Sequence, residues 1–154
     1  MNQYTLGRQI AVVARLWRGE LDRRLQPHNL SQARYVLLTL LAEAPEPIAQ
    51  NDLAERAGIT GPTLVRQLDQ LENAGLVQRQ DAPEDRRVKH VCITGAGRIA
   101  HRIANNIAIA LRSELTAGLP LPQQHCLQAS LSSVLQQLDT IRLSDSAKSA
   151  RSTK

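Results

Sequence analysis

The chain has 154 residues, of which 42% are hydrophobic and 21% charged, so it is too apolar for a disordered protein and suits one domain, with or without an extension. One Trp, two Tyr and no Phe favour helices packed on helices over a β-sandwich, whose core favours aromatic residues. The formal charge of +5 is compatible with a solvated basic surface and with a polyanionic partner such as nucleic acid.

Membrane, secreted, metal-binding and catalytic proteins are all disfavoured by the sequence. No apolar run approaches the roughly 18 residues that span a bilayer, and charges interrupt the amphipathic N-terminus too early for a secretory signal. Cys92 and Cys126 lie far apart without metal-ligand spacing, and the histidines are scattered. We therefore expect no metal, no cofactor and a cytoplasmic location. No Ser-His-Asp order, glycine-rich phosphate loop or carboxylate pair occurs in a plausible context, so we expect no enzyme.

The N-terminal segment predicts a long amphipathic helix. Apolar residues recur at steps of three and four over residues 5–26, and Pro27 ends the pattern. Val12 and Leu16 add a second apolar stripe, which a single small domain does not need. A helix that is apolar on two sides usually has a packing partner on each, so we expect this one to contribute to an interface.

Three shorter helices are predicted next, over residues 32–43, 49–57 and 61–74. Gly58 is placed to end the second of them, because glycine tolerates the left-handed backbone of a helix C-terminus. Thr60 is placed to cap the third with its hydroxyl.

The hydrophobic period then changes from helical to strand-like. Residues 76–80 and 87–94 predict two strands joined by a charged turn, which together form a hairpin with a polar tip. Long helices follow over residues 96–116 and 121–143. The tail, residues 144–154, has no apolar residue beyond two alanines and is expected to be disordered.

The second and third of the shorter helices, with the tight turn between them, predict a helix-turn-helix whose second helix reads the DNA major groove. Leu64, Leu68 and Leu71 form the inward stripe of that second helix. The opposite face has no large apolar side chain and no carboxylate among its first residues, as a surface that approaches base edges requires. The candidate DNA-binding residues on it are Gly61, Pro62, Thr63, Arg66, Gln67 and Gln70. Taken alone, this helix could instead present an ordinary solvated face.

The charged hairpin directly after the helix-turn-helix predicts a wing. Arg86 and Arg87 lie in its turn, and Lys89 follows on the second strand, so these three residues complete the candidate DNA-binding set. An arginine at a wing tip can enter the minor groove, where A·T-rich segments have enhanced negative potential. A lone charged loop is more often simply solvated, but the wing and the helix-turn-helix together favour DNA binding.

These elements predict a mainly α fold with a small β-hairpin wing. Residues 29–95 form the expected winged helix-turn-helix lobe, residues 1–28 and 96–143 a helical dimerisation region, and residues 144–154 a disordered basic tail. Because the three long helices carry more apolar surface than one small domain can bury, we expect an intertwined homodimer.

The segments QNDLAERAGITGPTLVRQLDQLENAGLVQRQ and DAPEDRRVKHVCIT resemble the MarR family of winged helix-turn-helix regulators, and the match with the SlyA branch is closer still. The resemblance covers residues 6–97 closely. It implies that Arg66 contacts bases or phosphates and that Arg87 enters the minor groove. It also implies that Asp85 and Arg86 set the shape of the wing.

The same resemblance implies that the protein binds pseudo-palindromic sites in double-stranded DNA as a homodimer. Many family members lose affinity for DNA when a phenolic carboxylate occupies a cleft between the dimer helices and the DNA-binding lobe. Trp17, Arg18 and Tyr35 come from segments that would line such a cleft. They are therefore the candidate ligand-binding residues for a small aromatic acid, with core and interface packing as the alternative role.

The sequence departs from the family pattern at two places. Ala49 stands where the family usually has a Ser or Thr cap, and Asp52 is expected to compensate in part through the helix dipole. His90 and Cys92 stand at wing-strand positions where SlyA-like proteins tend to carry basic residues. The wing should therefore bind phosphates less strongly.

The sequence therefore predicts a homodimeric, sequence-specific transcriptional regulator, either a repressor or an activator. Two alternatives of other classes remain. One is an architectural DNA-binding protein without sequence preference, whose purely electrostatic binding would fall steeply with salt. The other is a protein-interaction module that keeps the fold without binding DNA, and Thr63, Arg66 and Arg87 argue against it.

Overall fold

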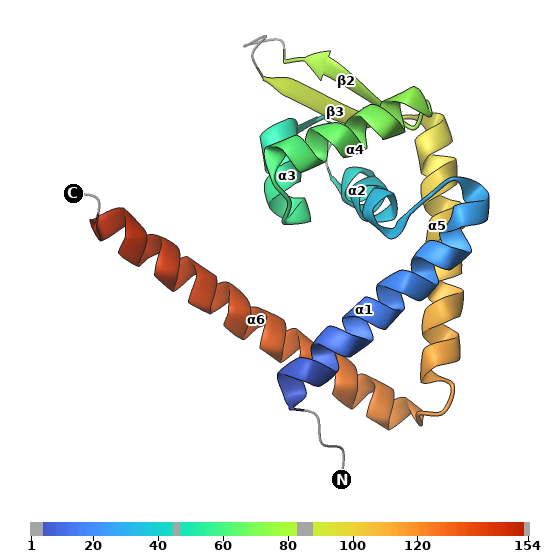
Figure 1. The fold of residues 1–154 in the computed structure, drawn as a ribbon, viewed down its shortest axis with the longest axis vertical. Helices are drawn as coiled ribbons and strands as arrows, with labels where there is room; N and C mark the ends of the chain where they lie inside the picture. Colours follow the sequence, from blue (N-terminus) through green and yellow to red (C-terminus); the bar gives the residue numbers. More distant parts are fainter. Residues whose placement is uncertain (1–4, 45–46, 83–87, 153–154) are drawn as a thin grey trace. The chain divides into compact units, whose positions relative to one another are not determined.

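The computed structural model describes residues 5–44, 47–82 and 88–152, with side chains as far as residue 141 (Figure 1). Its elements are α1 (Leu6–Leu25), a 3-10 turn (Gln26–His28), α2 (Gln32–Glu43), β1 (Ile48–Ala49), α3 (Gln50–Ala57), α4 (Gly61–Asn73), β2 (Val77–Asp81), β3 (Lys89–Ile93), α5 (Gly95–Thr116) and α6 (Leu121–Ser152). The predicted class, mainly helical with a small β-sheet, is confirmed. The chain divides into two compact units, residues 1–111 and 112–154, which are described in turn.

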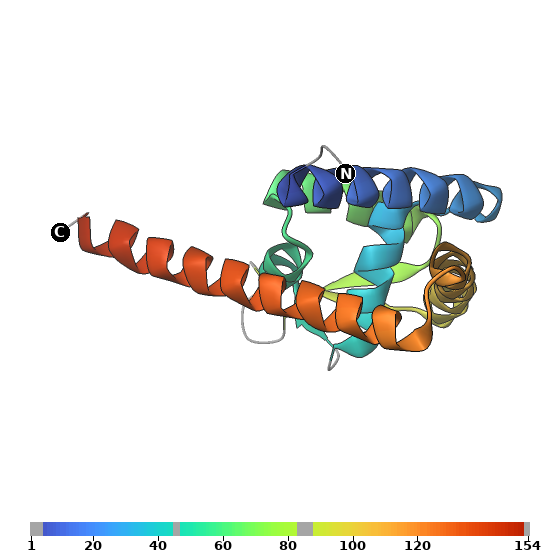
Figure 2. The same cartoon turned by 90° about the horizontal axis from the view of Figure 1, so that it is seen from below.

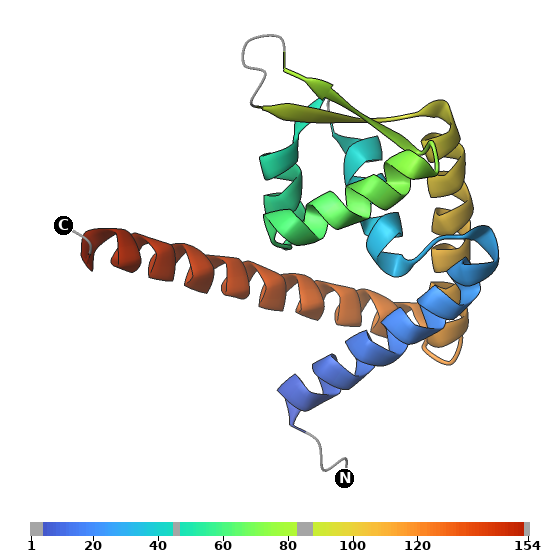
Figure 3. The ribbon, with the colours of Figure 1, turned by 45° about the horizontal axis from the view of Figure 1, so that its top comes forward.

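The sheet has three antiparallel strands in the order β1-β3-β2, one more than the predicted hairpin. The added strand is β1, where Ile48 lies opposite Val91 and Ala49 opposite His90. Ala49 is also the N-cap of α3 and makes no side-chain capping bond, as its place at the family's cap position indicated, although the helix itself begins one residue later than predicted. A segment of two residues is too short to show a hydrophobic period, so β1 is a strand only because it pairs with β3. The hairpin of β2 and β3 lies beside α4, and β3 leads directly into α5 (Figure 3).

The core of the first unit is built from leucines. The predicted inward stripe of α4 is confirmed, because Leu64, Leu68 and Leu71 are each 0% exposed. The last turns of α1 add Leu21 and Leu25 to the same cluster, and α1 lies across α2 (Figure 2). Full burial of one such side chain contributes about 1.5–3 kcal/mol. This shared core therefore fixes α4 in the lobe and determines which of its faces remains outside.

The beginning of α5 passes very close to the turn before β2. Thr94 caps α5, since its Oγ1 accepts a hydrogen bond from the Gly97 amide at 3.0 Å. The same hydroxyl donates to the Gly75 carbonyl at 2.7 Å. A Cβ built on Gly97 would lie 2.0 Å from the carbonyl oxygen of Leu76. Only a residue without a side chain fits at this crossing.

The second unit consists of the end of α5 and all of α6. The Gln124 side-chain amide donates to the carbonyls of Thr116 at 3.2 Å and Leu119 at 2.8 Å, which closes the turn between the two helices.

The expectation of a disordered tail over residues 144–154 is wrong for residues 144–152, because α6 continues to Ser152. Four of these nine residues are the strong helix formers alanine, lysine and arginine, and the other five are serine or aspartate, so local propensity alone is not decisive. Extending an existing helix avoids the cost of nucleating a new one.

Candidate nucleic-acid interface

The helix-turn-helix is formed by α3, a tight turn and α4. Gly58 has φ +64 and ends α3 as predicted. The amide of Ile59 donates to the Ala54 carbonyl at 3.1 Å, and the Gly58 amide to the Glu55 carbonyl at 3.0 Å. These bonds satisfy carbonyls at the end of α3 and turn the chain into α4.

The start of α4 differs from the prediction in one respect. Thr60 occupies the N-cap position, but its side chain makes no capping hydrogen bond to the backbone. Its hydroxyl is paired instead with the Thr63 hydroxyl, with the two oxygens 2.8 Å apart. The Thr60 hydroxyl is thus engaged with another side chain, and the positive end of the α4 dipole lacks a side-chain cap. Gly61, Pro62 and Thr63 are exposed around this end.

The structure separates the predicted outward face of α4 into an exposed part and a flank. Arg66 is exposed, like the first-turn residues before it. Gln67 and Gln70 are half-buried. Oε1 of Gln70 accepts a hydrogen bond from Nη2 of Arg34 on α2 at 2.9 Å. The amide of Gln70 is therefore partly engaged within the lobe, and Arg66 is the long polar side chain of the set that remains fully outward.

A cavity of about 330 Å³ lies between α1, α2, the turn after α3 and α4. Its walls combine apolar side chains with the polar groups of Arg18, Thr63 and Gln67. Oε1 of Gln67 is buried and has no hydrogen-bond partner among the described residues. An unsatisfied buried acceptor is costly, and because this oxygen has almost no exposed surface it does not face the cavity but marks a local cost of packing α4.

The three candidate ligand-binding residues have different surroundings. Of these, Arg18 lines the cavity. Trp17 packs against the core. Tyr35 donates from its hydroxyl to Oδ1 of Asn105 at 2.9 Å and stacks on His101, with the ring centroids 6.0 Å apart. Tyr35 thereby connects α2 to α5, a contact that the sequence pattern did not indicate.

The wing is described only along its strands. Asp85, Arg86 and Arg87 lie outside the described residues. Lys89 forms an ion pair across the hairpin with Asp81. Sγ of Cys92 accepts a hydrogen bond from Nε2 of Gln80 at 3.1 Å, which places this half-buried cysteine in contact with the neighbouring strand.

The sequence analysis missed an ion cluster between β2 and α4. Nε of Arg79 donates to Oε2 of Glu72 at 2.9 Å, and the Arg79 backbone amide donates to Oε1 of the same carboxylate at 3.1 Å. Nη2 of Arg79 donates to Asp69 at 2.6 Å and to Glu72 at 2.5 Å. The hydrogen bonds and charge of Arg79 hold the pKa of Glu72 below its usual range. The signal available in the sequence was a pair of opposite charges, Glu72 and Arg79, seven residues apart on either side of the helix-ending Gly75.

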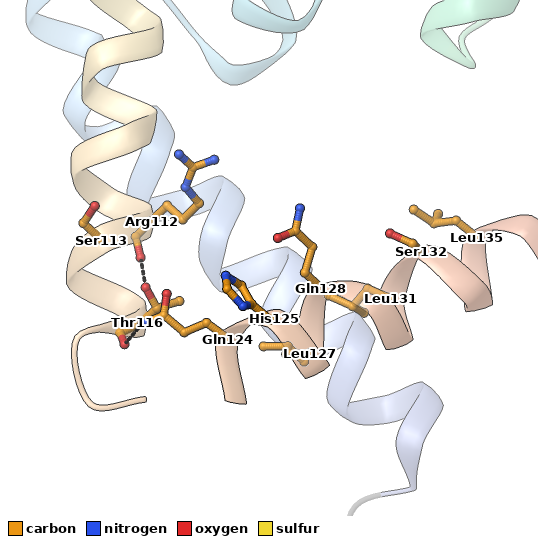
Figure 4. A pocket seen from close by; sticks show the side chains of 10 residues that line it. All are labelled: Arg112, Ser113, Thr116, Gln124, His125, Leu127, Gln128, Leu131, Ser132 and Leu135. Carbon is orange, nitrogen blue, oxygen red and sulfur yellow. Dashed lines mark hydrogen bonds between the residues drawn. The ribbon is translucent and has the colours of Figure 1, made fainter. Parts of the chain in front are cut away.

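A second, more open hollow lies within residues 112–154. It has a volume of about 730 Å³ and is lined by the end of α5 and the first half of α6. Figure 4 shows Arg112, His125 and Gln128 pointing toward this space, with Leu131 and Leu135 further along α6.

Among the described residues, no cluster of His, Cys, Asp or Glu suits a metal ion. No helix within residues 5–44, 47–82 and 88–152 is long and apolar enough to cross a membrane.

Comparison with known proteins connects this geometry to one family. The sequence profile of the MarR family matches residues 30–89, the winged helix-turn-helix region. The solved transcriptional regulator PA3341 is 38% identical, with a TM-score of 0.76 over 88% of this chain and 99% of its own. A MarR-family transcriptional regulator from Rhodococcus sp. RHA1 is 27% identical, with a TM-score of 0.77 over 84% of this chain and 91% of its own.

A third structure, CouR from Rhodococcus jostii RHA1, was solved with bound p-coumaroyl-CoA. It is 25% identical, with a TM-score of 0.74 over 84% of this chain and 91% of its own. The profile match, the near-complete coverage of a 38% identical regulator and the winged helix-turn-helix agree. The chain belongs to the MarR family of transcriptional regulators.

Proposed function

We propose that the protein is a homodimer that binds pseudo-palindromic sites in duplex DNA and regulates transcription there without catalysing a reaction. The observation that carries this proposal is the exposed face of α4. An uncapped helix N-terminus, small or hydroxyl-bearing first-turn residues and the outward Arg66 suit approach to the major groove. Arg87 is proposed to enter the minor groove from the wing, as the family resemblance implies.

The proposal of a homodimer rests on apolar surface that the described chain leaves uncovered. On α1, Leu6 is 67% exposed and Val13 is 65% exposed. On α6, the side chains of Leu135 and Leu138 are 62% and 50% exposed, and Leu131 borders the open hollow of Figure 4. Soluble proteins rarely leave such stripes in water. A second copy would bury them in a two-fold interface of roughly 2,000 Å² or more.

The closeness of the recognition helix and the DRR motif to the SlyA branch supports placing the protein there. A regulator of bacterial transcription of this kind would act in the cytoplasm. The choice between repressor and activator depends on where its sites lie relative to promoters, and mapping the bound sites across the genome would decide it.

Footprinting and sedimentation of the complex test this function together. We expect two protected half-sites with centres about 10 base pairs or a multiple of that apart, bound by two chains per duplex. Affinity for this site should exceed affinity for a scrambled duplex by roughly 10³-fold or more at physiological salt. Equal affinity for both duplexes would indicate an architectural protein, and the absence of any DNA binding would indicate an interaction module.

The cavity beside α4 is proposed to hold a small phenolic carboxylate that releases the protein from DNA. Arg18 can bind the carboxylate, and the polar side chains of Thr63 and Gln67 line the same cavity and can hydrogen-bond to the phenol hydroxyl. Because Thr63 and Gln67 belong to α4, a ligand that contacts them acts directly on the DNA-reading helix. The p-coumaroyl-CoA bound by CouR supports an aromatic effector in this family. Trp17 and Tyr35 remain candidates for shaping the walls indirectly.

Salicylate is a suitable probe of this cavity. Arg18→Ala should weaken salicylate binding about 10- to 100-fold, since a hydrogen bond to a charged group contributes about 1.5–3 kcal/mol. Arg15→Ala, which removes an exposed arginine of the same helix outside the cavity, is the matched control. Calorimetric titration measures both. An unchanged affinity in Arg18→Ala, or equal binding of uncharged salicylamide by the wild type, would refute this site.

A further inference from the structure

We propose that Arg79 is a positioning residue for DNA recognition, which neutralises the two carboxylates on the wing-side flank of α4 and fixes that flank against β2. This role rests on the proposed DNA binding and extends it to a residue that need not contact DNA. The carboxylates are those of Asp69 and Glu72, and both form ion pairs with the Arg79 guanidinium.

The position of Asp69 makes its charge important. It lies three residues after Arg66, so the two side chains are neighbours on the surface of α4. The side chain of Asp69 is 51% exposed, next to the face proposed to approach DNA phosphates. An unneutralised carboxylate there would repel the phosphates and would also attract the Arg66 guanidinium. The ion pair with Arg79 reduces both effects.

The position of Glu72 makes the contact rigid. Its carboxylate accepts from the backbone amide as well as from the guanidinium of Arg79, so it holds both the strand and the side chain. Arg79 in turn lies opposite Val91 in the β2–β3 ladder. One residue therefore fixes the base of the wing strands relative to the reading helix. Glu72 is ionised at neutral pH, as any exposed glutamate would be, and its lowered pKa reflects the hydrogen bonds and charge of Arg79, so this contact is present under the conditions in which DNA is bound.

The geometry favours a positioning role over direct phosphate binding by Arg79. Its side chain is only 25% exposed, and both Nε and Nη2 are already directed at carboxylates. A phosphate could reach only the remaining donors of this guanidinium, and the neighbouring carboxylates would repel it, which favours the positioning role.

A double-mutant cycle separates the two roles. Arg79→Met keeps the aliphatic stem, and Asp69→Asn removes the charge that Arg79 neutralises. We expect Arg79→Met to lower specific affinity about tenfold or more, and Asp69→Asn to restore the part of that loss that comes from the Asp69 charge, while the part that comes from the lost contact with Glu72 remains. In the wild-type background, Asp69→Asn should change affinity less than about threefold. The coupling should shrink as salt rises, because it is electrostatic. Arg102→Ala on α5, which removes one exposed positive charge, controls for net charge.

Each result has one interpretation, provided that thermal unfolding shows the variants to be folded. If Arg79→Met does not fold, Arg79→Gln, which also removes the charge, replaces it in the same cycle. A wild-type protein without specific DNA binding would overturn the proposed function and this role with it. The positioning role alone would be overturned if the wild type binds DNA specifically but Asp69→Asn has the same effect in the wild-type and Arg79→Met proteins. If Arg79→Met lowers the slope of log affinity against log salt concentration by about one, and Asp69→Asn does not restore affinity, Arg79 binds a phosphate directly.

Discussion

Gly97→Ala should destabilise the protein by about 3 kcal/mol, at the upper end of the cost of overpacking a tight site. The new Cβ would lie 2.0 Å from the Leu76 carbonyl oxygen and 2.8 Å from Cγ1 of Ile93. The Leu76 backbone cannot move aside cheaply, since its carbonyl accepts from the Thr94 amide at 3.0 Å and its own amide donates to the Leu71 carbonyl at 2.9 Å. Helix propensity alone predicts the opposite sign, a gain of about 0.5–1 kcal/mol.

Thermal unfolding followed by circular dichroism measures this effect. A loss of 3 kcal/mol should lower the midpoint by about 6–12 °C for a chain of this size. Gly95→Ala is the matched control, because it adds the same methyl group to the same helix where no atom lies within 4 Å of the new Cβ. It should change stability by less than about 0.5 kcal/mol. If both variants unfold at the same temperature, α5 does not cross the chain as closely as described.

The helices of the lobe could be predicted from the sequence because their leucines repeat with a helical period. The bounds of α2 were predicted without error, and those of α4 differ by one residue. Gly58 and Gly75 at the helix ends have φ +64 and +70, the left-handed backbone expected there. β1 was missed because a strand of two residues exists only through its pairing with β3, and the sequence around residues 48–49 does not indicate that distant pairing. The helical tail was missed because low apolar content was given more weight than the extension of an existing helix.

The candidate site could be predicted only in part. Periodicity separated the buried leucines of α4 from Arg66, but the orientation of Gln67 and Gln70 depends on α2 and the cavity beside it. Nothing in the spacing placed Arg34 near Gln70. The Arg79 cluster was missed because charge pairs across a turn have no helical or strand period. These features arise from tertiary packing, whereas the reading helix and its outward arginine follow from local pattern.

Arg66→Ala should abolish specific footprints and leave weak, salt-sensitive binding to any duplex. Arg66 is exposed on the outer face of α4, one turn after the uncapped helix N-terminus. An arginine that reaches guanine O6 and N7 makes two hydrogen bonds at once and discriminates by about 1–3 kcal/mol, whereas one on phosphate adds affinity without sequence preference. The wing remains in the variant, and the net charge falls only from +5 to +4, so nonspecific binding should persist.

Lysine at this position separates charge from geometry. Arg66→Lys keeps the positive charge but cannot form the bidentate contact, so it should restore nonspecific affinity and only part of the specificity. The measurement is a titration of wild type and both variants against one palindromic site and a scrambled duplex, at two salt concentrations. Arg56→Ala, which removes an exposed arginine from α3 instead, shows the effect of losing one charge near the same lobe. If Arg66→Ala retains the wild-type ratio of specific to scrambled affinity, α4 does not read sequence through Arg66, and the base contacts must come from elsewhere on the lobe.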